Sequence, residues 1–351
     1  MPRIALVTCR PGPEVAVDRD LPGLVEALRD AGADAEAVVW DDPDVDWADH
    51  DLAVIRSTWD YSWRAAEFTA WAQKTGAVTR LANPAEVIRW NSDKRYLGEL
   101  AAAGVPTVPT RYLAPGDPAD LPDGHEYVVK PTSGAGARFA ARYTPDERDI
   151  AVRQLARMHA EGFTAMVQPY VRGIDVSGER ALQFFDGRLL HASRKGAVLA
   201  PGTPYDERKV AHPGLEPWQP TDAEIAVAEQ ALAAVPRALL MDLRGRRSGV
   251  RCVRSACNVE GHVAEPPGPP HRAASVRAGR RDAAEIHQEG PKAPELLYAR
   301  VDLVDGDDGR PRVMELELVE PNLFLSLHTG SVAGVVAGIL RSARAADRSR
   351  P

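Results

Sequence analysis

Short apolar runs alternate with a helical pattern over the first 60 residues of the chain. The runs are residues 4–8, 37–40 and 52–55, and the helical spacing covers residues 21–31. Strands that alternate with helices are typical of a parallel sheet with crossover helices, so the pattern predicts an α/β domain. Ligands in such sheets bind beyond the carboxyl ends of the strands, which is where Arg56–Tyr61 falls.

The next hundred residues contain helix and strand signals in a recognisable order. Ser92 is expected to cap the amino end of a helix that Gly104 and Pro106 terminate. Residues 127–131 then read as a strand that closes with a lysine and leads into the small-residue loop 132–138. Further on, an Asp-Gly pair between two apolar runs, residues 180–185 and 188–192, predicts a hairpin.

Residues 238–292 differ in composition from the rest of the chain. They contain no Phe, Trp or Tyr, nine Arg, and two of the three cysteines. Such a segment buries too little apolar surface to offset the entropy of ordering it, so it is predicted to be a disordered or poorly packed insertion. A shifted reading frame in a GC-rich gene would look the same. A basic arm that binds RNA is the functional alternative.

Composition excludes several broad classes. The formal net charge of −7 argues against a general binder of nucleic acid or of anionic membranes. No apolar run reaches the roughly 20 residues that cross a bilayer, and the first run is too short for a signal peptide. Cys9, Cys252 and Cys257 lack the spacing of a disulfide framework or a zinc site. A cytoplasmic enzyme with no membrane partner is expected.

Several common nucleotide and hydrolase motifs do not occur in the sequence. It has no Gly-Lys dipeptide and therefore no Walker A loop, no G-x-G-x-x-G fingerprint and no G-x-S-x-G elbow. The acidic tract Asp305–Gly309 fails the pattern of an EF-hand and is interpreted as a hairpin turn.

Two strands near the carboxyl end, residues 296–304 and 312–320, bring three carboxylates together. Glu315 and Glu317 point to one face of a strand, whereas Met314, Leu316 and Leu318 are expected on the other face. An antiparallel return can place Asp302 opposite Glu315. Three such carboxylates repel one another unless a cation or solvent neutralises them, and hard oxygen ligands suit Mg²⁺. The alternative is the solvated face of an edge hairpin.

Lysines supply the opposite charge. Lys130 closes a strand directly before the glycine-containing loop, so its ammonium could reach phosphates that the backbone N–H groups of the loop surround. The alternative is a surface lysine beside an ordinary turn. Lys94 taken alone would be a solvated helix residue.

Together these pieces resemble the ATP-grasp ligases, in particular glutathione synthetases and D-alanine–D-alanine ligases. The shared order is a lysine-bearing helix ending in Ala-Gly-Val-Pro, then Val-Val-Lys-Pro, a Gly-rich loop, Val-Gln-Pro-Tyr-Val, and Arg-Val-Asp with Glu-Leu-Glu and Pro-Asn. Fuller strings are similar to the actinobacterial group that contains the O-ureidoserine cyclo-ligase of D-cycloserine biosynthesis. These strings are Arg-Ser-Thr-Trp-Asp-Tyr, Asn-Pro followed by Trp-Asn-Ser-Asp-Lys, Ser-Arg-Lys-Gly and Glu-Leu-Glu-Leu-Val-Glu-Pro-Asn-Leu-Phe-Leu. The resemblance covers residues 3–236 and 294–340.

The resemblance implies an α/β fold, with α+β structure in the ATP-grasp lobes. Residues 1–90 would form a Rossmann-like amino-terminal domain. Residues 91–170 would form the small ATP-grasp lobe with its Gly-rich loop. Residues 171–345 would form the carboxyl-terminal lobe with the metal site, interrupted by residues 238–292.

The resemblance also implies a cofactor set of ATP and Mg²⁺, with Mn²⁺ as a substitute. Nucleotide contacts would come from residues along the lobes: Lys94, Lys130, Ser133, Gly134 and Gly136 at the phosphates, Gln168, Tyr170 and Val171 at adenine, and Glu179 at the ribose. Asp302, Glu315 and Glu317 would hold the metal, although Glu317 stands where many relatives have Asn. Arg300 matches an arginine that stabilises the tetrahedral intermediate in the D-alanine ligases.

Substrate residues are expected at the end of the third strand. Arg56, Trp59, Asp60 and Tyr61 offer a cation, an anion and aromatic walls, which suits an amino-acid-like molecule. Asn322 is a further substrate candidate, and Arg194 and Lys195 are catalytic candidates that could take a second carboxylate. Packing at a domain boundary is the alternative for Trp59 and Tyr61. His191 is expected to be a packed strand residue.

The sequence therefore predicts an ATP-dependent carboxylate–amine ligase, or an intramolecular cyclising ligase, that works through an acyl phosphate. A nucleotide-binding protein without ligase activity, impaired by the insertion, is the alternative. A third interpretation is an interaction module that uses the Arg-rich insertion. The expected partner is a small molecule, and homodimers are common in the resembled families.

Overall fold

The structure is a computed structural model that describes residues 1–12, 17–134, 139–200, 214–236 and 296–347, together with Gly202 and Leu239. These residues belong to one compact unit, formed by Met1–Leu243 and Ala293–Pro351. Of the sequence predictions, Gly136 and the insertion at 238–292, apart from Leu239, lie outside the described residues.

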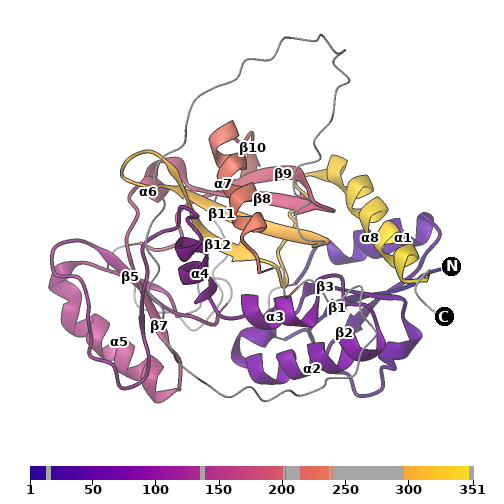
Figure 1. Ribbon diagram of the computed structural model, residues 1–351, viewed down its shortest axis with the longest axis horizontal. Helices are drawn as coiled ribbons and strands as arrows, with labels where there is room; N and C mark the ends of the chain where they lie inside the picture. Colours follow the sequence, from indigo (N-terminus) through magenta and orange to yellow (C-terminus); the bar gives the residue numbers. More distant parts are fainter. Residues whose placement is uncertain are drawn as a thin grey trace, which may run out of the picture. The chain divides into compact units, whose positions relative to one another are not determined.

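The amino-terminal region is a parallel three-stranded sheet in the order β2-β1-β3 (Figure 1). Its strands are β1 (Arg3–Thr8), β2 (Asp34–Val39) and β3 (Leu52–Ser57). Its helices are α1 (Leu21–Asp30) and α2 (Ala65–Val78). The chain leaves β1 toward β2 and returns to the other side for β3, and both pairings are parallel, which confirms the expectation from the alternating apolar runs.

Two short helices follow where the sequence suggested one. Helix α3 (Ala85–Asn91) ends at Ser92, and α4 (Tyr96–Ala102) begins four residues later. Ser92 is therefore not an N-cap: its hydroxyl donates to the carbonyl oxygen of Ile88 at 2.7 Å and closes the preceding helix. The turn between the helices presents Lys94. Gly104 has a φ of +85° just after α4, as expected of a residue that terminates a helix.

A second sheet has four strands in the order β4-β7-β5-β6. The strands are β4 (Arg111–Leu113), β5 (Tyr127–Pro131), β6 (Ala141–Tyr143) and β7 (Ala165–Pro169). Helix α5 (Arg148–Ala160) packs Ala151, Leu155 and Met158 against it. Glu147 closes a capping box with Thr144 just ahead of this helix. Lys130 is on β5, the central strand next to β7.

The third sheet has five strands in the order β10-β9-β8-β11-β12 (Figure 1). The strands are β8 (Glu179–Phe185), β9 (Arg188–Lys195), β10 (Glu216–Trp218), β11 (Tyr298–Asp305) and β12 (Pro311–Glu317). The helices are α6 (Gly173–Ser177), α7 (Asp222–Ala233) and α8 (Val332–Asp347). Short 3-10 helices occur at Trp47–Asp49, Trp59–Trp63, Pro145–Glu147 and Thr329–Ser331. Asp186 and Gly187 both have positive φ in the β8–β9 turn, as the predicted hairpin requires.

One face of the five-stranded sheet is apolar and the other is polar. Leu182, Val301 and Leu316 pack with residues of α7 and α4 on the apolar face. The alternate residues of the same strands, among them Glu179, Asp302 and Glu315, point to the opposite face. Helices α1 and α8 lie side by side and share one core with the amino-terminal sheet.

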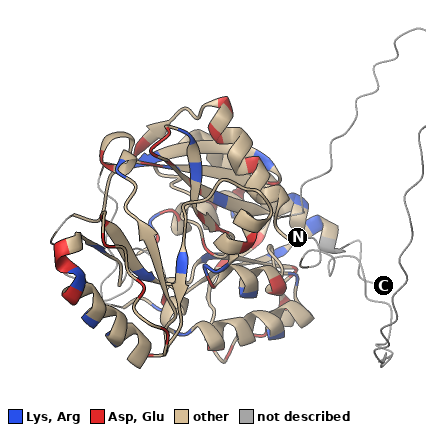
Figure 2. Ribbon diagram, turned by 60° about the vertical axis from the view of Figure 1, so that its left-hand side comes forward, with Lys and Arg blue, Asp and Glu red and all other residues tan. Residues whose placement is uncertain are grey.

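The mixed helix and sheet content confirms the predicted fold class. Among the described helices, none combines the length and the hydropathy that a bilayer span requires. Figure 2 shows basic and acidic residues interspersed along the ribbon.

Candidate active site

The polar face of the five-stranded sheet forms one wall of a cleft with about 1020 Å³ of open space. The other wall comes from β5, β7 and the turn that carries Lys94. Twelve residues that the sequence predicted for the site line this cleft: Lys94, Lys130, Gly134, Gln168, Tyr170, Val171, Glu179, Lys195, Arg300, Asp302, Glu315 and Glu317.

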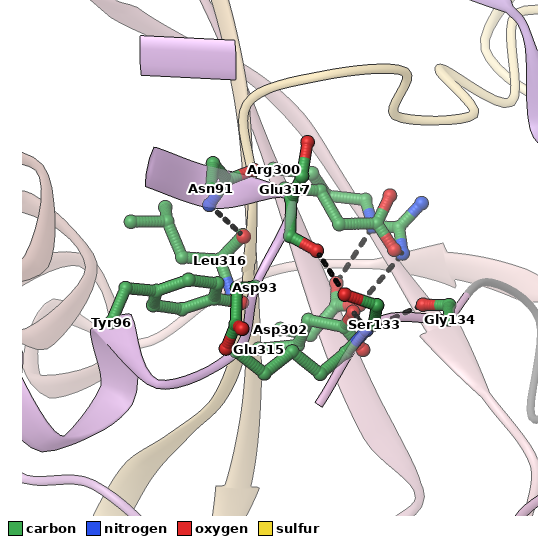
Figure 3. A network of polar contacts seen from close by, with 12 residues as sticks. Asn91, Asp93, Tyr96, Ser133, Gly134, Arg300, Asp302, Glu315, Leu316 and Glu317 are labelled. Carbon is green, nitrogen blue, oxygen red and sulfur yellow. Dashed lines mark hydrogen bonds and ion pairs between the residues drawn. The ribbon is translucent and has the colours of Figure 1, made fainter. Parts of the chain in front are cut away.

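The strand register brings the three predicted metal ligands together. Asp302 is opposite Glu315, and Arg300 is opposite Glu317, on the antiparallel pair β11–β12. One oxygen from each of Asp302, Glu315 and Glu317 lies within 4.8 Å of the others. Figure 3 shows these side chains turned toward one another. The observed register thus brings the three carboxylates together, whereas the alternation of side chains along each strand predicted their pairing only to within one residue.

A bulge in this strand pair changes one sequence expectation. The register shifts between Asp302 and Leu303, so Met314 is an extra residue on β12. Met314 was expected to pack on the apolar face with Leu316. Instead it lines the cleft beside Glu315 and packs with Ile174. Bulges re-aim side chains in this way near functional sites.

Every carboxylate of the cleft has a basic partner. Asp302 accepts hydrogen bonds from Arg300 Nε at 2.8 Å and from Lys195 Nζ at 2.7 Å. Lys195 also donates to Glu179 at 2.6 Å. Arg300 reaches Glu317 as well, and Lys94 Nζ is 3.2 Å from Glu315 Oε1. The cleft therefore contains four carboxylates and four cations, the fourth cation being Lys130.

Burial and pairing shift these groups in different directions. Burial would raise the pKa of Asp302, but the charges of Arg300 and Lys195 outweigh it and hold the pKa well below its usual range. Burial would also raise the pKa of Glu315, but the positive charges of Lys94 and Lys130 have the larger effect and lower it. At Glu317 burial prevails and raises the pKa to about 8. Burial lowers the pKa of Lys130.

The cleft also has apolar lining residues. Val128, Val171, Ile174, Met314 and Leu199 line it. Gln168 is nearly fully buried there, and its Nε2 donates to Thr110 Oγ1 at 2.9 Å. Tyr170 donates its hydroxyl to Asp175 at 2.5 Å and lies under the Arg142 guanidinium.

The segment after β9 was not predicted from the sequence. Gly196, Val198 and Leu199 line the cleft, yet they have no periodic pattern that would indicate it. The only signal was the Ser-Arg-Lys-Gly string, which ends at Gly196 and closely precedes the other two.

Seven of the described residues that the sequence predicted for the site do not line this cleft. Arg194 alternates with Lys195 on β9 and therefore projects to the other side, where it pairs with Glu216 at 2.6 Å. Ser133 donates to the carbonyl oxygen of Ser92 at 3.1 Å and holds the loop rather than lining the cleft. Trp59 and Tyr61 are almost entirely buried, and Tyr61 packs with Phe68 in the core of the amino-terminal region.

Asp60 and Arg56 are buried and engaged in separate contacts. Trp40 Nε1 and Arg64 both donate to Asp60, at 3.0 and 3.1 Å. Arg56 donates to the carbonyl oxygen of Pro321 at 3.2 Å, and its Nη2 is 3.9 Å from Asp18. The sequence offered Arg56 and Asp60 as the cation and the anion that bind a substrate, and in the structure Arg56 lies near Asp18 while Asp60 accepts from Trp40 and Arg64.

Asn322 lies next to the charged wall. Its backbone oxygen accepts from Gln183 Nε2 at 2.7 Å, and its side-chain oxygen accepts from Phe324 N at 2.9 Å. The Phe324 ring centre is 5.7 Å from the Arg300 guanidinium. The Pro321–Phe324 segment therefore connects Arg56 on one side with Arg300 on the other.

Comparisons with known proteins show the family to which the chain belongs. Residues 4–83 match the family model described as D-cycloserine synthetase DcsG, N-terminal domain. The chain is 36% identical to the cycloserine biosynthesis protein DcsG of Streptomyces lavendulae over 99% of both chains.

Solved structures give the same relationship. The crystal structure of D-cycloserine synthetase DcsG matches with a TM-score of 0.75 and 33% identity, covering 97% of this chain and 99% of that one. D-alanine–D-alanine ligase from Bacillus anthracis in complex with ATP matches with a TM-score of 0.58 at 14% identity over the full length of both chains.

Proposed function

The chain belongs to the DcsG family of ATP-grasp ligases and is an ATP-dependent ligase that forms C–N bonds; from this premise we propose that it activates the carboxylate of an amino-acid-like substrate as an acyl phosphate. An amine does not form an amide with a free carboxylate directly, because the carboxylate would have to expel oxide as its leaving group. Transfer of a phosphoryl group gives a leaving group that an amine, from a second molecule or from the same one, can displace.

The single observation that carries the proposal is that one cleft combines a set of paired charged side chains with apolar lining residues. The apolar lining residues, among them Val128, Val171 and Ile174, would suit an adenine ring. The lysines and carboxylates are the groups that phosphates and a metal require. Glu179 lies on the β8 side of the cleft and would accept from the ribose hydroxyls.

The donor set fits Mg²⁺ or Mn²⁺. Three carboxylates with ligand atoms this close make a hard oxygen site, and Glu315 and Glu317 are each 24% exposed and so can be approached. A bound Mg²⁺ would neutralise phosphate charge. Glu317 offers a carboxylate where many ATP-grasp enzymes have an amide, and it remains a competent ligand.

The basic residues would position and stabilise the reacting groups. Lys94 and Lys130 would hold phosphate oxygens, with the loop at Ser133 and Gly134 beside them and Gly136 beyond. Arg300 would face the charge that develops at the activated carboxyl, because preorganised donors act where charge appears in the transition state. Lys195 would keep Asp302 and Glu179 in place.

The substrate would extend from Arg300 toward Asn322 and Arg56. Arg56 would bind a carboxylate of the amino-acid-like molecule, with Trp59, Asp60 and Tyr61 shaping the region behind it. The relative from Streptomyces lavendulae is a cycloserine biosynthesis protein, so antibiotic biosynthesis in the cytoplasm, where ATP is supplied, is the proposed setting. The partner is a small molecule.

ADP release over a panel of amino acids, including ureido- and hydroxyl-substituted ones, tests the proposal. We expect ADP only when an amino-acid-like carboxylate is present. A product that has lost one water from a single substrate indicates cyclisation, and one that combines two substrates indicates joining. An ¹⁸O label in the carboxylate should appear in the released phosphate. Turnover that leaves all label in the organic product would contradict the acyl phosphate.

A further inference from the structure

The outer edge of β12 is paired in an unusual way. β12 is an edge strand of the five-stranded sheet, and at Val313 its backbone pairs with the chain near Thr107. Beyond that point, at the residues between and after the two glutamates, the edge is satisfied by side chains instead. Edge strands normally present unpaired backbone groups, so these side chains replace a neighbouring strand.

Asn91 forms two of these bonds. Its Nδ2 donates to the carbonyl oxygen of Leu316 at 2.8 Å, and its Oδ1 accepts from Leu318 N at 2.7 Å. Tyr96 supplies a third, because its hydroxyl accepts from Leu316 N at 3.0 Å. Both side chains are more than nine-tenths buried. Figure 3 shows Asn91 and Tyr96 on either side of Leu316, with Glu315 and Glu317 next to it in the chain.

The same short segment also holds the phosphate side of the cleft. Lys94 N donates to the carbonyl oxygen of Thr132 at 2.8 Å. Ser133 Oγ donates to the carbonyl oxygen of Ser92 at 3.1 Å. Lys94 Nζ bonds to the carbonyl oxygen of Gly134 and lies 3.2 Å from Glu315. Residues 91–96 therefore contact both the strand that carries the glutamates and the loop that follows β5.

We propose that Asn91 and Tyr96 are positioning residues that fix Glu315 and Glu317 relative to Lys94, so that metal and nucleotide bind as one unit. This inference rests on the proposed function, because it assumes that β12 carries two ligands of the metal. An amide can donate and accept at once and so reproduces the pairing of a β-strand. A backbone fixed at Leu316 and Leu318 fixes Glu317 between them and Glu315 directly before Leu316.

Asn83 provides a matched comparison within the chain. It is also fully buried, and its Nδ2 donates to the carbonyl oxygens of Tyr298 and Leu318 while its Oδ1 accepts from Leu297 N. Its bonds therefore tie β11 to the end of β12 but do not reach Leu316. Asn83→Ala removes the same kind of bonds at a similar depth without touching the residue between the two glutamates.

The test is a Mg²⁺ titration of the full-length protein at a fixed ADP concentration, read as the rise in melting temperature. Positioning partners of metal ligands typically change metal affinity by about 10- to 100-fold. Asn91→Ala should therefore raise the half-maximal Mg²⁺ concentration at least about tenfold, whereas Asn83→Ala should leave it as in wild type. Alanine adds no charge, so electrostatics at the glutamates do not confound the comparison. Both variants are expected to melt lower than wild type without ligand.

Tyr96→Phe removes only the hydroxyl that accepts from Leu316 N. It should also raise the half-maximal Mg²⁺ concentration, but by less than Asn91→Ala does. If Asn91→Ala does not fold, Tyr96→Phe alone tests the inference. Equal Mg²⁺ dependence in Asn91→Ala and Asn83→Ala, or an unchanged one in Tyr96→Phe, would overturn the inference. If wild type itself shows no Mg²⁺-dependent stabilisation by ADP, the proposed function fails instead, so the two failures are distinguishable.

Discussion

Two regions that the sequence marked as functional have opposite characters in the structure. On the wall formed by the five-stranded sheet, charged side chains face an open cleft and pair with one another along that wall. At the end of β3, Arg56–Tyr61 also follows a predicted pattern, yet its charged side chains are buried in bonds to the protein itself. The first region is open to a ligand, whereas in the second the charged groups already have protein partners that a substrate would have to replace.

The two regions differ in how well their sequence pattern predicts the direction of each side chain. Within β11 and β12 the period of two determines which side chains share a face. After β3 the chain enters the 3-10 helix Trp59–Trp63, where the period changes and successive side chains leave in other directions. Residue type alone then cannot say whether Asp60 meets a substrate or a protein donor.

The largest expected effect is a difference in unfolding free energy between Asp302→Ala and Glu315→Ala, two variants on the cleft wall. Asp302 is 1% exposed and holds both Arg300 and Lys195. Asp302→Ala leaves two buried cations short of an anion, and breaking such a pair costs roughly 3–5 kcal/mol of unfolding free energy. Glu315 is 24% exposed, and its ion pair with Lys94 is worth about 1 kcal/mol or less. Chemical denaturation of both variants measures the difference.

Both variants should lose most activity and the stabilisation that Mg-nucleotide gives wild type, about 2.7 kcal/mol at a hundredfold excess over Kd. Charge counting from the sequence suggested that removing any of the three carboxylates relieves repulsion. The cations beside them reverse that expectation for Asp302. Asp308→Ala, in the exposed β11–β12 turn, is the control and should behave as wild type. A fully active Glu315→Ala would remove the metal site from the proposal.

The Arg56 region gives the next effect. Arg56→Ala removes the donor to Pro321 and the partner of Asp18, a loss of roughly 2–3 kcal/mol for bonds of a charged group. If Arg56 also binds substrate, the KM for the amino acid should rise far more than the KM for ATP. Arg148→Ala is the control, since Arg148 likewise donates to a backbone oxygen, that of Leu121, and to an aspartate, Asp123, and its helix α5 supplies no lining residue of the cleft. Equal changes in both KM values would leave Arg56 a purely structural residue.

Much of the fold followed from local pattern. The parallel sheet, the Asp-Gly hairpin and the pairing of Asp302 with Glu315 each rest on a period or a turn signal that the structure reproduces. The bulge at Met314 could not be foreseen, because a single extra residue leaves no mark on composition. The side-chain pairing of Asn91 with β12 joins residues more than 200 positions apart, and no local pattern reports such a contact.

The smallest expected effect lies between the two regions, at His191. Its ring stacks on His328 at 4.0 Å. Nε2 lies 2.8 Å from the carbonyl oxygen of Leu323 and therefore donates to it, and Nδ1 is 2.9 Å from Ser331 Oγ.

Burial, followed by the charge of His328, lowers the pKa of His191 to about 4. The unfolded chain binds this proton near pH 6.5, so the free energy of unfolding should fall as pH drops from 6.5 to 4. Because the ring is partly exposed, the loss attributable to His191 should be about 1–2 kcal/mol. His191→Gln should flatten this part of the pH profile relative to wild type, while His125→Gln on the exposed loop before β5 should not. A profile that keeps its full slope in His191→Gln would show that other groups dominate the acid sensitivity of the Pro321–Phe324 segment and its surroundings.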